Sequence, residues 1–487
     1  MEVLFQAVVT GIALTVLGYT VSVLRLAFHP DLRKIPGPFV SRFTTWPLKI
    51  EVLRGHRTKY IHELHRQYGP YVRIAPSEIS TSSIEAHRQI HRISTEFIKA
   101  PWYQGQTPTQ IDDNTCGVFG LRNQKVASAR RRLFQQAGTK AAVVQWEPVV
   151  VGLVKAVIGK IKRDASQGTA DVAKWFSLLT SDVLSSLAFG EPFRMVENET
   201  KSQLIHDIES GMIFIGVRQE LPWLWYLIMY LPIPSIGRPN DIFKRFDVYG
   251  ETAVKNTKAA KPGSAKTLFS KMVPEDGTQK IPDSIVRHET ANIIIAGSDT
   301  TAIALTYLVY SVLKHPNIHQ KLAAELETCS EDPSWEELES KPYINNVITE
   351  TLRLHAPVPS SLPRVASEGT FLGGQYAIPG FAVVDTQAYT FHRDPRVFPN
   401  PEQFDPDRWS HATPEMKEHF QAFGGTIRTC LGQNVARMEL LHATALFFRE
   451  LPNARLADST TAESMDIIDF FVIKPKGGKC EITTKDV

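Results

Sequence analysis

The chain has 487 residues, of which 43% are hydrophobic and 22% charged, values typical of a globular protein and inconsistent with disorder along the whole chain. The formal net charge of +3 is too small to indicate a nucleic-acid surface, and no nucleic-acid partner is expected. The four cysteines lie far apart in the sequence, which excludes a disulfide framework and a Cys-rich zinc site and favours a reducing compartment.

The N-terminal segment from Val3 to Leu24 contains no charged residue. As a helix it would reach about 33 Å, enough to cross a hydrocarbon core about 30 Å thick. A cleaved signal peptide usually has a shorter apolar region and a small-residue cleavage site, which is not evident after Leu24. A buried core helix is the other alternative. We expect one transmembrane helix over residues 3–24, within a membrane anchor of residues 1–29.

The charges that flank this segment predict its orientation. Arg25, Arg33 and Lys34 follow it, whereas only Glu2 and the α-amino group precede it. By the positive-inside rule, the body of the protein then lies in the cytosol. A proline-rich hinge of residues 30–39 is expected to be stiff and turn-prone, and to lead into a single domain of residues 40–487.

The body of the chain has the pattern of helices with little sheet. Residues 121–355 predict helices with short breaks, and the strand-like segments are few: 71–74, 371–377 and 381–384. Residues 392–409 are rich in Pro, Asp and Arg and predict an irregular loop. We expect a mainly α protein with small β-sheets (α+β), built as a single large helical domain. The nucleophile elbow, the P-loop, the dinucleotide-binding turn and the H-E-x-x-H helix are not found in the sequence.

Residues 423–432 form a Gly-flanked segment that places Cys430 just before a predicted helix from about Asn434 to Leu451. The free N–H groups and the dipole of a helix N-terminus would favour a thiolate and lower the pKa of Cys430. The glycines would let a flat partner approach the backbone closely. The alternative is a buried, inert cysteine, as most free cysteines are.

A second predicted helix, from about Asp283 to Lys314, carries the sequence Ala-Gly-Ser-Asp-Thr-Thr at residues 296–301. At about 3.6 residues per turn, Gly297 and Thr300 share a face whose small side chains leave room for a planar ligand. Burying Asp299 without partners would be costly, which indicates a function. Close helix packing, with the hydroxyls bonded to carbonyls four residues earlier, explains the pattern equally well.

A third segment contains Glu350 and Arg353 three residues apart on one predicted helical face, where their charges can pair. The same Glu-x-x-Arg pattern occurs elsewhere in the chain, so it is informative only through its place in a larger order.

Along the chain, the helix segment 296–301 comes first, followed by Glu350 and Arg353, the Pro/Asp/Arg-rich loop and the cysteine segment. This order resembles the cytochrome P-450 superfamily. The family's cysteine signature is F-x-x-G-x-R-x-C-x-G, and residues 423–432 match it except at Thr426, where the family usually has glycine. Residues 296–300 match the oxygen-activating motif, and residues 350–353 match the family's E-x-x-R. Residues 406–409 match the loop whose arginine completes that charge cluster. The similarity runs from the anchor to the C-terminus, and the domain organisation resembles fungal microsomal members of secondary metabolism.

The resemblance implies a role for each matching residue. Cys430 would be the metal ligand, the axial thiolate on the iron of haem b. Asp299 and Thr300 would be catalytic and would deliver protons for oxygen activation. A structural charge cluster on the haem side of the core would consist of Glu350, Arg353 and Arg408.

Further haem contacts are implied for Phe423, Gly432 and Gly297. Haem propionates need cationic partners, for which the candidates are Arg428, Arg364 and Arg131. In the family, the last of these belongs to a Trp-or-His-x-x-x-Arg helix whose first position is Ala127 here, so one propionate contact is expected to be missing. The alternative for the arginines at 130–132 is a solvated helix face.

The substrate pocket is placed only by region. The candidates are Trp102, Phe119, Phe214, Val358, Leu362 and Phe470, for each of which ordinary core packing is the alternative. Together they indicate a lipophilic small-molecule substrate of low charge.

We therefore expect a haem-thiolate monooxygenase that inserts one oxygen atom from O2 into a lipophilic small molecule of fungal secondary metabolism. Electrons would come from NADPH through NADPH–cytochrome reductase. The enzyme would be a single-pass protein of the endoplasmic reticulum membrane, in contact with membrane lipid, with its catalytic domain in the cytosol. The alternatives are a haem-thiolate enzyme that catalyses a rearrangement or dehydration without O2, and a non-catalytic haem-binding sensor. The Asp299–Thr300 pair argues against both, since neither needs it.

Overall fold

The structure is a computed structural model that describes residues 1–92, 96–105, 116–230, 239–259, 267–269, 282–425 and 428–485. The chain divides into two compact units. The first unit comprises residues 1–100 and 360–391, and the second comprises residues 101–359 and 392–487. Helices predominate, and the sheets among the described residues are small, which confirms the predicted fold class.

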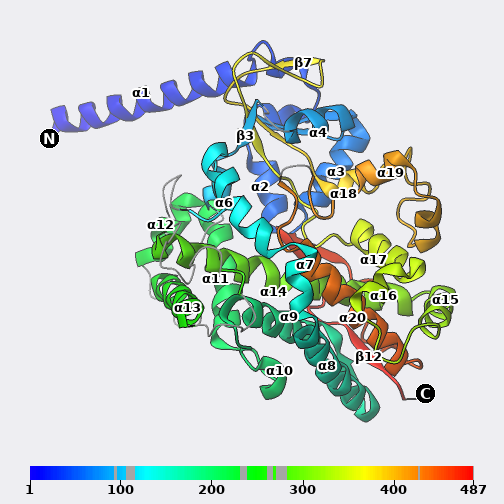
Figure 1. The fold of residues 1–487 in the computed structure, drawn as a ribbon. Helices are drawn as coiled ribbons and strands as arrows, with labels where there is room; N and C mark the ends of the chain where they lie inside the picture. The colour runs from blue at the N-terminus through cyan, green and yellow to red at the C-terminus, as the bar shows by residue number, and fades with distance from the viewer. Residues whose placement is uncertain are drawn as a thin grey trace. The chain divides into compact units, whose positions relative to one another are not determined.

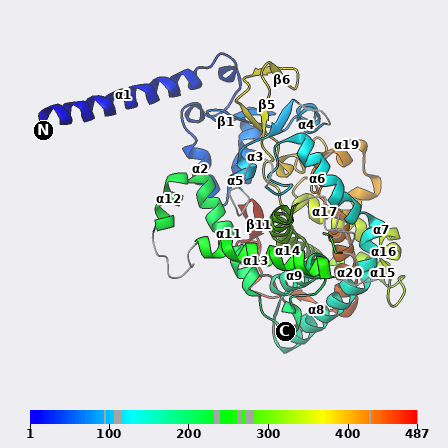
Figure 2. The same cartoon turned by 60° about the vertical axis from the view of Figure 1, so that its left-hand side comes forward.

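The first unit begins with α1 (Glu2–Ala27), which projects away from its sheet in both views (Figures 1 and 2). Leu4–Ala27 contains an apolar window with a mean hydropathy of 2.0, none of which is buried, so this segment is long and apolar enough to span a membrane. Among the described residues, Lys140–Gln167 and α14 (Asp283–Leu313) also meet this test by length and composition. Of their apolar windows, 33% and 61% are buried within the protein, in contrast to the unburied window of α1.

A five-stranded sheet organises the first unit, in the order β1-β2-β8-β5-β3. Neighbouring strands are antiparallel except for β2 and β8, which run parallel. The bounds are β1 (Tyr71–Ala75), β2 (Glu78–Thr81), β3 (Phe97–Lys99), β5 (Arg364–Ala366) and β8 (Val383–Asp385), with a separate pair β6 (Thr370–Leu372) and β7 (Tyr376–Ile378). The predicted strands correspond to β1, to the β6–β7 pair and to β8. The short strands β2, β3 and β5 were not predicted.

Short helices complete the first unit: η1 (Leu32–Lys34), η2 (Phe39–Arg42), α2 (Trp46–Leu53), α3 (Arg57–Tyr68), α4 (Ile84–His91) and α18 (Ala388–Phe391). The unit's core contains Leu32 and Ile35 from the segment after α1, packed with Tyr71, Ile79 and Val384 from the sheet. The apolar residues after the predicted anchor are therefore part of a folded core.

The second unit holds most of the helices. They are α5 (Trp102–Gly105), α6 (Gln124–Ala137), α7 (Lys140–Val143), η3 (Val144–Trp146), α8 (Glu147–Gln167), α9 (Val172–Phe189), α10 (Met195–Asn198), α11 (Gln203–Glu220), α12 (Pro222–Tyr230), α13 (Pro239–Ala259), α14, α15 (Pro316–Leu326), α16 (Trp335–Ser340), α17 (Pro342–Leu354), η4 (Pro406–His411), α19 (Pro414–His419) and α20 (Gln433–Glu450). Its strands are β4 (Ala170–Asp171), β9 (Arg455–Leu456), β10 (Ile467–Phe470), β11 (Val472–Pro475) and β12 (Glu481–Thr483), arranged as β4-β12-β9 and β10-β11.

The centre of the second unit is α14, which packs along α9, α13 and α20. Local signals set the ends of these helices. Asp171 Oδ1 accepts the Ala173 N–H at 3.1 Å at the start of α9, and Gly190 ends this helix with a φ of 82°. α14 follows Pro282, and Pro316 starts the next helix. The predicted helices over 283–314 and 434–451 are both confirmed to within one residue.

Candidate active site

The cysteine segment is a tight loop that leads into α20. The Cys430 N–H donates to Phe423 O at 2.9 Å, and the Arg428 N–H donates to Gly425 O at 3.3 Å. Gly424 has a φ of 68°, in the left-handed region that favours glycine. The Cys430 side chain is exposed and lies three residues before Gln433, the first residue of α20. Thr426, the departure from the family signature, lies outside the described residues.

The electrostatic surroundings of Cys430 differ from the prediction. The thiol is exposed at its surface but lies deep among surrounding protein atoms, and this desolvation raises its pKa above the ordinary value. A hydrogen bond from the Gly432 backbone and the charge of Arg131 both lower the pKa, but by less. The prediction of a lowered pKa is therefore wrong, because burial outweighs the helix N-terminus.

Two adjacent arginines of α6 bind different partners. Arg131 Nη2 donates to Thr429 O at 2.6 Å, which joins α6 to the cysteine loop. Arg130 is buried, with its Nη1 2.7 Å from Cys116 O and 3.3 Å from Glu289 Oε1. Of the three arginines at 130–132, only Arg132 is exposed. The alternative that all three lie on a solvated helix face is therefore wrong.

The surroundings of Cys430 fit a haem. Arg131 Nε is buried and has no hydrogen-bond partner among the described residues. An unsatisfied buried guanidinium N–H calls for an acceptor, and a carboxylate such as a haem propionate supplies one. Three groups here suit an anionic cofactor with a thiolate ligand. They are the exposed thiol, the backbone N–H groups at the start of α20 and this arginine. At Gly432, an added Cβ would lie 4.0 Å from Cys430 Sγ, an ordinary contact.

The other predicted haem contacts lie in both units. Phe423 and Arg428 are half-buried in the cysteine loop of the second unit. Arg364 is buried in the first unit, on β5, where its Nη1 donates to Leu362 O at 3.2 Å and to Pro363 O at 3.0 Å. Its role toward a propionate stays a prediction.

The predicted catalytic residues lie in the middle of α14, where Asp299 and Thr300 are half-buried. Thr300 Oγ1 donates to Ala296 O at 2.9 Å, the bond to the carbonyl four residues earlier that was the structural alternative. A Cβ on Gly297 would lie 3.0 Å from Leu184 on α9, so this glycine permits close helix packing. A haem contact for Gly297 and proton transfer by Asp299 and Thr300 stay predictions.

Glu439 is a buried acid that the sequence analysis missed. It lies on the side of α20 that meets α14, where Thr301 hydrogen-bonds its side chain. Desolvation raises its pKa to about 8, so the group is largely protonated at neutral pH. The signal in the sequence was an acid surrounded by the apolar residues of a predicted core helix.

The predicted charge cluster comes together around Glu350. Arg353 Nη2 and Nε each lie 2.8 Å from its carboxylate oxygens, and Arg408 Nε lies 3.1 Å from Oε1. Trp409 Nε1 and the Asp405 N–H also donate to Glu350, at 2.8 and 2.9 Å. Glu350 and Arg353 are fully buried. The five hydrogen bonds to one carboxylate offset its desolvation and tie α17 to the 405–409 segment.

Aromatic side chains of the second unit form a cluster that includes two predicted pocket residues. Trp102 and Phe119 both contact Phe471, with ring centroids 5.4 and 5.9 Å apart, and Tyr103 contacts both Trp102 and Phe119. The predicted residue Phe470 is 48% exposed, and Lys474 Nζ lies 5.6 Å from its ring centroid. The structure therefore places Phe471, and not Phe470, in this cluster. Phe471 has a φ of 81°, an uncommon conformation for a bulky residue, at the turn between β10 and β11.

The remaining pocket candidates are dispersed. Val358 is half-buried in the second unit, and Leu362 is half-buried in the first. Phe214 belongs to α11, but its side chain lies outside the described part of the structure.

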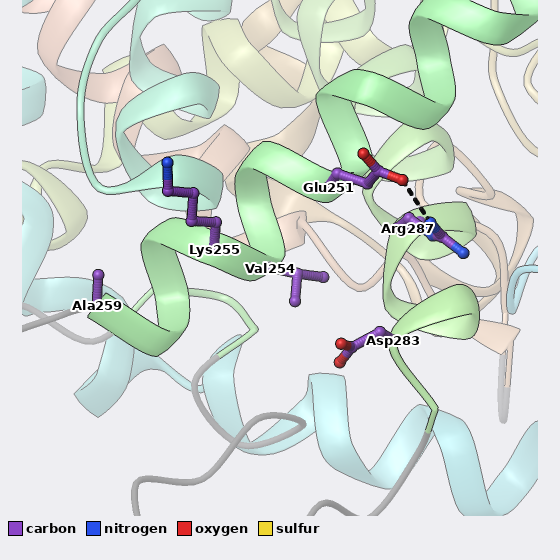
Figure 3. A pocket seen from close by; sticks show the side chains of 6 residues that line it. All are labelled: Glu251, Val254, Lys255, Ala259, Asp283 and Arg287. Carbon is purple, nitrogen blue, oxygen red and sulfur yellow. Dashed lines mark hydrogen bonds and ion pairs between the residues drawn. The ribbon is translucent and has the colours of Figure 1, made fainter.

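A separate cavity of about 570 Å³ opens between α13 and the start of α14 (Figure 3). Its lining is charged, and Arg287 Nη1 lies 2.7 Å from Glu251 Oε1. The full lining is Glu251, Val254, Lys255, Ala259, Asp283 and Arg287. Asp299 stands about four helical turns farther along α14, so this cavity is distinct from the candidate active site.

Comparisons with known proteins identify the family. The family described as Cytochrome P450 matches residues 36–480. Cytochrome P450 monooxygenase tazI of Aspergillus terreus is 36% identical over 93% of this chain and 93% of its own length. Cytochrome P450 monooxygenase stcB of Emericella nidulans is 34% identical over 94% of this chain and 90% of its own length. Cytochrome P450 monooxygenase aflV of Aspergillus parasiticus is 34% identical over 95% of this chain and 93% of its own length. The chain belongs to the cytochrome P450 family.

Proposed function

We propose that this protein is a haem-thiolate monooxygenase that transfers one oxygen atom from O2 to a lipophilic small molecule of fungal secondary metabolism. The observation that carries the proposal is the exposed Cys430 thiol before α20, beside an arginine whose buried Nε has no partner among the described residues. The names of the relatives, all monooxygenases, support the reaction class.

Each residue would contribute a binding, positioning or proton-transfer step. Cys430 would ligate the haem iron, and Arg131, with Arg428 and Arg364 as further candidates, would bind the propionates. When bound, the haem supplies the redox chemistry that activates O2, with electrons delivered by a reductase. Thr300 and Asp299 would hold and move a proton at the middle of α14. The aromatic cluster around Phe471 would present an apolar surface to the substrate.

The location follows from α1. Residues 1–29 would anchor the enzyme in the endoplasmic reticulum membrane in a single pass, residues 30–39 would connect the anchor, and residues 40–487 would form a cytosolic catalytic domain. The uncharged stretch of α1 from Val3 to Leu24, whose apolar window is not buried, and the basic residues that follow it support this proposal. NADPH–cytochrome reductase in the same membrane would be the electron donor.

The spectrum of the reduced protein with carbon monoxide tests the site. The wild-type protein and a Cys329→Ser control should show the band of a thiolate-ligated haem, and Cys430→Ser should lose it. If Cys430→Ser keeps the band, the assignment of the ligand is wrong. With reductase, NADPH and 18O2, a monooxygenase puts labelled oxygen into its product. A product without label would indicate a rearrangement or dehydration instead.

A further inference from the structure

The buried hydroxyl of Thr180 on α9 reaches across to the backbone of α14. Thr180 is fully buried, and its Oγ1 donates to Ser298 O on α14. The same oxygen lies 3.0 Å from Phe176 O, the carbonyl four residues earlier in α9. A hydroxyl has a single proton, so the carbonyls of two helices compete for it. The bond to Ser298 O ties α9 to the residue that directly precedes Asp299.

Hydroxyl groups crowd the same turn of α14. Ser298 Oγ donates to Ile294 O at 2.8 Å, and Thr300 Oγ1 donates to Ala296 O at 2.9 Å. With the bond from Thr180, the carbonyls of residues 294, 296 and 298 each accept a side-chain hydroxyl. Hydroxyls bonded to helix carbonyls in this way weaken a helix slightly and often bend it. The geometry of this turn therefore depends on its side-chain partners as well as on its own backbone.

Two further contacts hold this part of α14 against its neighbours. A Cβ on Gly297 would lie 3.0 Å from Leu184, which follows Thr180 by one turn of α9. The side chain of Thr301 hydrogen-bonds the buried carboxyl group of Glu439 on α20. Both α9 and α20 pack on α14 (Figure 1). Contacts from two helices therefore brace the segment that contains the predicted catalytic residues.

The helical positions show how these contacts orient α14. At about 100° per residue, the braced positions 297, 298 and 301 fall within an arc of about 100°. Asp299 and Thr300 lie outside this arc and are half-buried, whereas the side chains at 298 and 301 are buried. The contacts on one face of the helix therefore determine the direction in which Thr300 points from another face.

We propose that Thr180 is a positioning residue for the oxygenation reaction: its bond to Ser298 O fixes the rotation of α14 about its axis and so holds the Thr300 hydroxyl in place for proton transfer. The inference rests on the proposed function, in which Thr300 moves a proton. A misplacement of about 1 Å in a reacting group can lower a rate about 10²-fold. Thr180 would act through α14 and not as a catalytic group.

The infrared stretching frequency of carbon monoxide bound to the reduced haem protein tests this positioning without a substrate. The frequency responds to polar groups near the bound gas. Thr300→Val should shift it, because the hydroxyl is lost. Thr180→Val keeps the shape of the side chain without its hydroxyl and should shift the frequency in the same direction, by less. In the Thr300→Val background, most of the Thr180→Val shift should vanish. The visible band that reports the thiolate ligand should stay the same in all these variants.

Thr290→Val is the matched control. Thr290 is a fully buried threonine of α14 whose Oγ1 donates to Val286 O at 2.8 Å, about two turns before Gly297 and on the same face. This variant should keep the wild-type frequency. Thr180→Ser keeps the hydroxyl and should restore that frequency. Circular dichroism and melting temperatures show whether each variant is folded, and Thr180→Ala serves if Thr180→Val does not fold.

An unchanged frequency in a folded Thr180→Val protein would overturn the inference. A Thr180→Ser protein that shifts as much as Thr180→Val would also overturn it, as would a Thr180→Val shift of equal size without the Thr300 hydroxyl. A shift in Thr300→Val alone leaves the proposed function standing and removes only the role of Thr180. If the wild-type protein lacks the thiolate band, or if Thr300→Val does not shift the frequency, the corresponding part of the proposed function fails and this inference fails with it.

Discussion

Glu289 on α14 and Arg130 on α6 form a salt bridge in which Oε1 and Nη1 are 3.3 Å apart and neither side chain is more than 5% exposed. The Val118 N–H lies 2.9 Å from both oxygens of Glu289, and Arg130 Nη1 also donates to Cys116 O. The pair therefore fixes the segment that leads to Phe119, a member of the aromatic cluster.

Replacing Arg130 with methionine should destabilise the protein strongly, because it leaves the Glu289 carboxylate buried without its cation. Breaking a buried pair on one side typically costs about 3–5 kcal/mol. The free energy of unfolding in urea, or the shift in melting temperature, measures this loss. Arg132→Met is the matched control, since Arg132 is exposed on the same helix. Equal losses in the two variants would contradict the importance of the pair.

Thr300→Val should lower the yield of product per NADPH consumed, because it removes the hydroxyl proposed to move a proton. General acid catalysis typically contributes about 10²–10⁴-fold, so we expect at least about a tenfold decrease in product formation. The carbon monoxide spectrum should not change. Thr300→Ser keeps the hydroxyl that donates to Ala296 O and should restore the yield. If Thr300→Val is as well coupled as the wild type, the proton-transfer role is wrong.

Glu439 should make the stability of the protein depend on pH. Its pKa is raised from 4.5 to about 8 in the folded protein, so the unfolded chain loses this proton at lower pH than the folded chain does. Below pH 4.5, Glu439 is protonated in both the folded and the unfolded chain, and its burial as a neutral group is least unfavourable. This part of the stability is lost as the pH rises from 4.5 to about 8. Across this range, the melting temperature of the wild type should fall below that of Glu439→Gln as the pH rises. Parallel curves would show that Glu439 does not titrate in this way.

Phe471→Ala should change ligand binding, whereas Phe470→Ala should not. Only the Phe471 ring contacts Trp102 and Phe119, and Phe470 is turned to solvent beside Lys474. The dissociation constants of imidazole and of the larger 4-phenylimidazole, measured from the shift of the haem absorption band, report on the pocket. We expect Phe471→Ala to change the ratio of the two constants several-fold. A larger change in Phe470→Ala would reverse this assignment.

The parts of the fold that the sequence predicts well are those set by local periodicity and helix stop signals. α14 and α20 have long apolar patterns bounded by proline or glycine, and their ends lie within one residue of the prediction. The short strands β2, β3 and β5 have three or four residues each, too few to show a period.

The errors in the candidate site come from effects that a sequence does not contain. Arg130 and Glu289 are 159 residues apart, so a run of arginines gave no sign that one of them is buried. The pKa of Cys430 depends on how many atoms surround it, and that burial outweighs the start of α20. Phe470 and Phe471 are adjacent phenylalanines, so the sequence does not distinguish them. The backbone turn between β10 and β11 determines that Phe471 faces the aromatic cluster.

Arg130 and Arg131 are consecutive in α6, but their side chains bind different parts of the second unit. Arg130 binds Glu289 and Cys116, and Arg131 binds Thr429, which precedes Cys430. Successive residues of a helix point about 100° apart, so a single rotational setting of α6 satisfies both. Inserting or deleting one residue near the start of this helix would turn both guanidinium groups away from their partners at once. α6 should therefore vary in composition among relatives far more readily than in length.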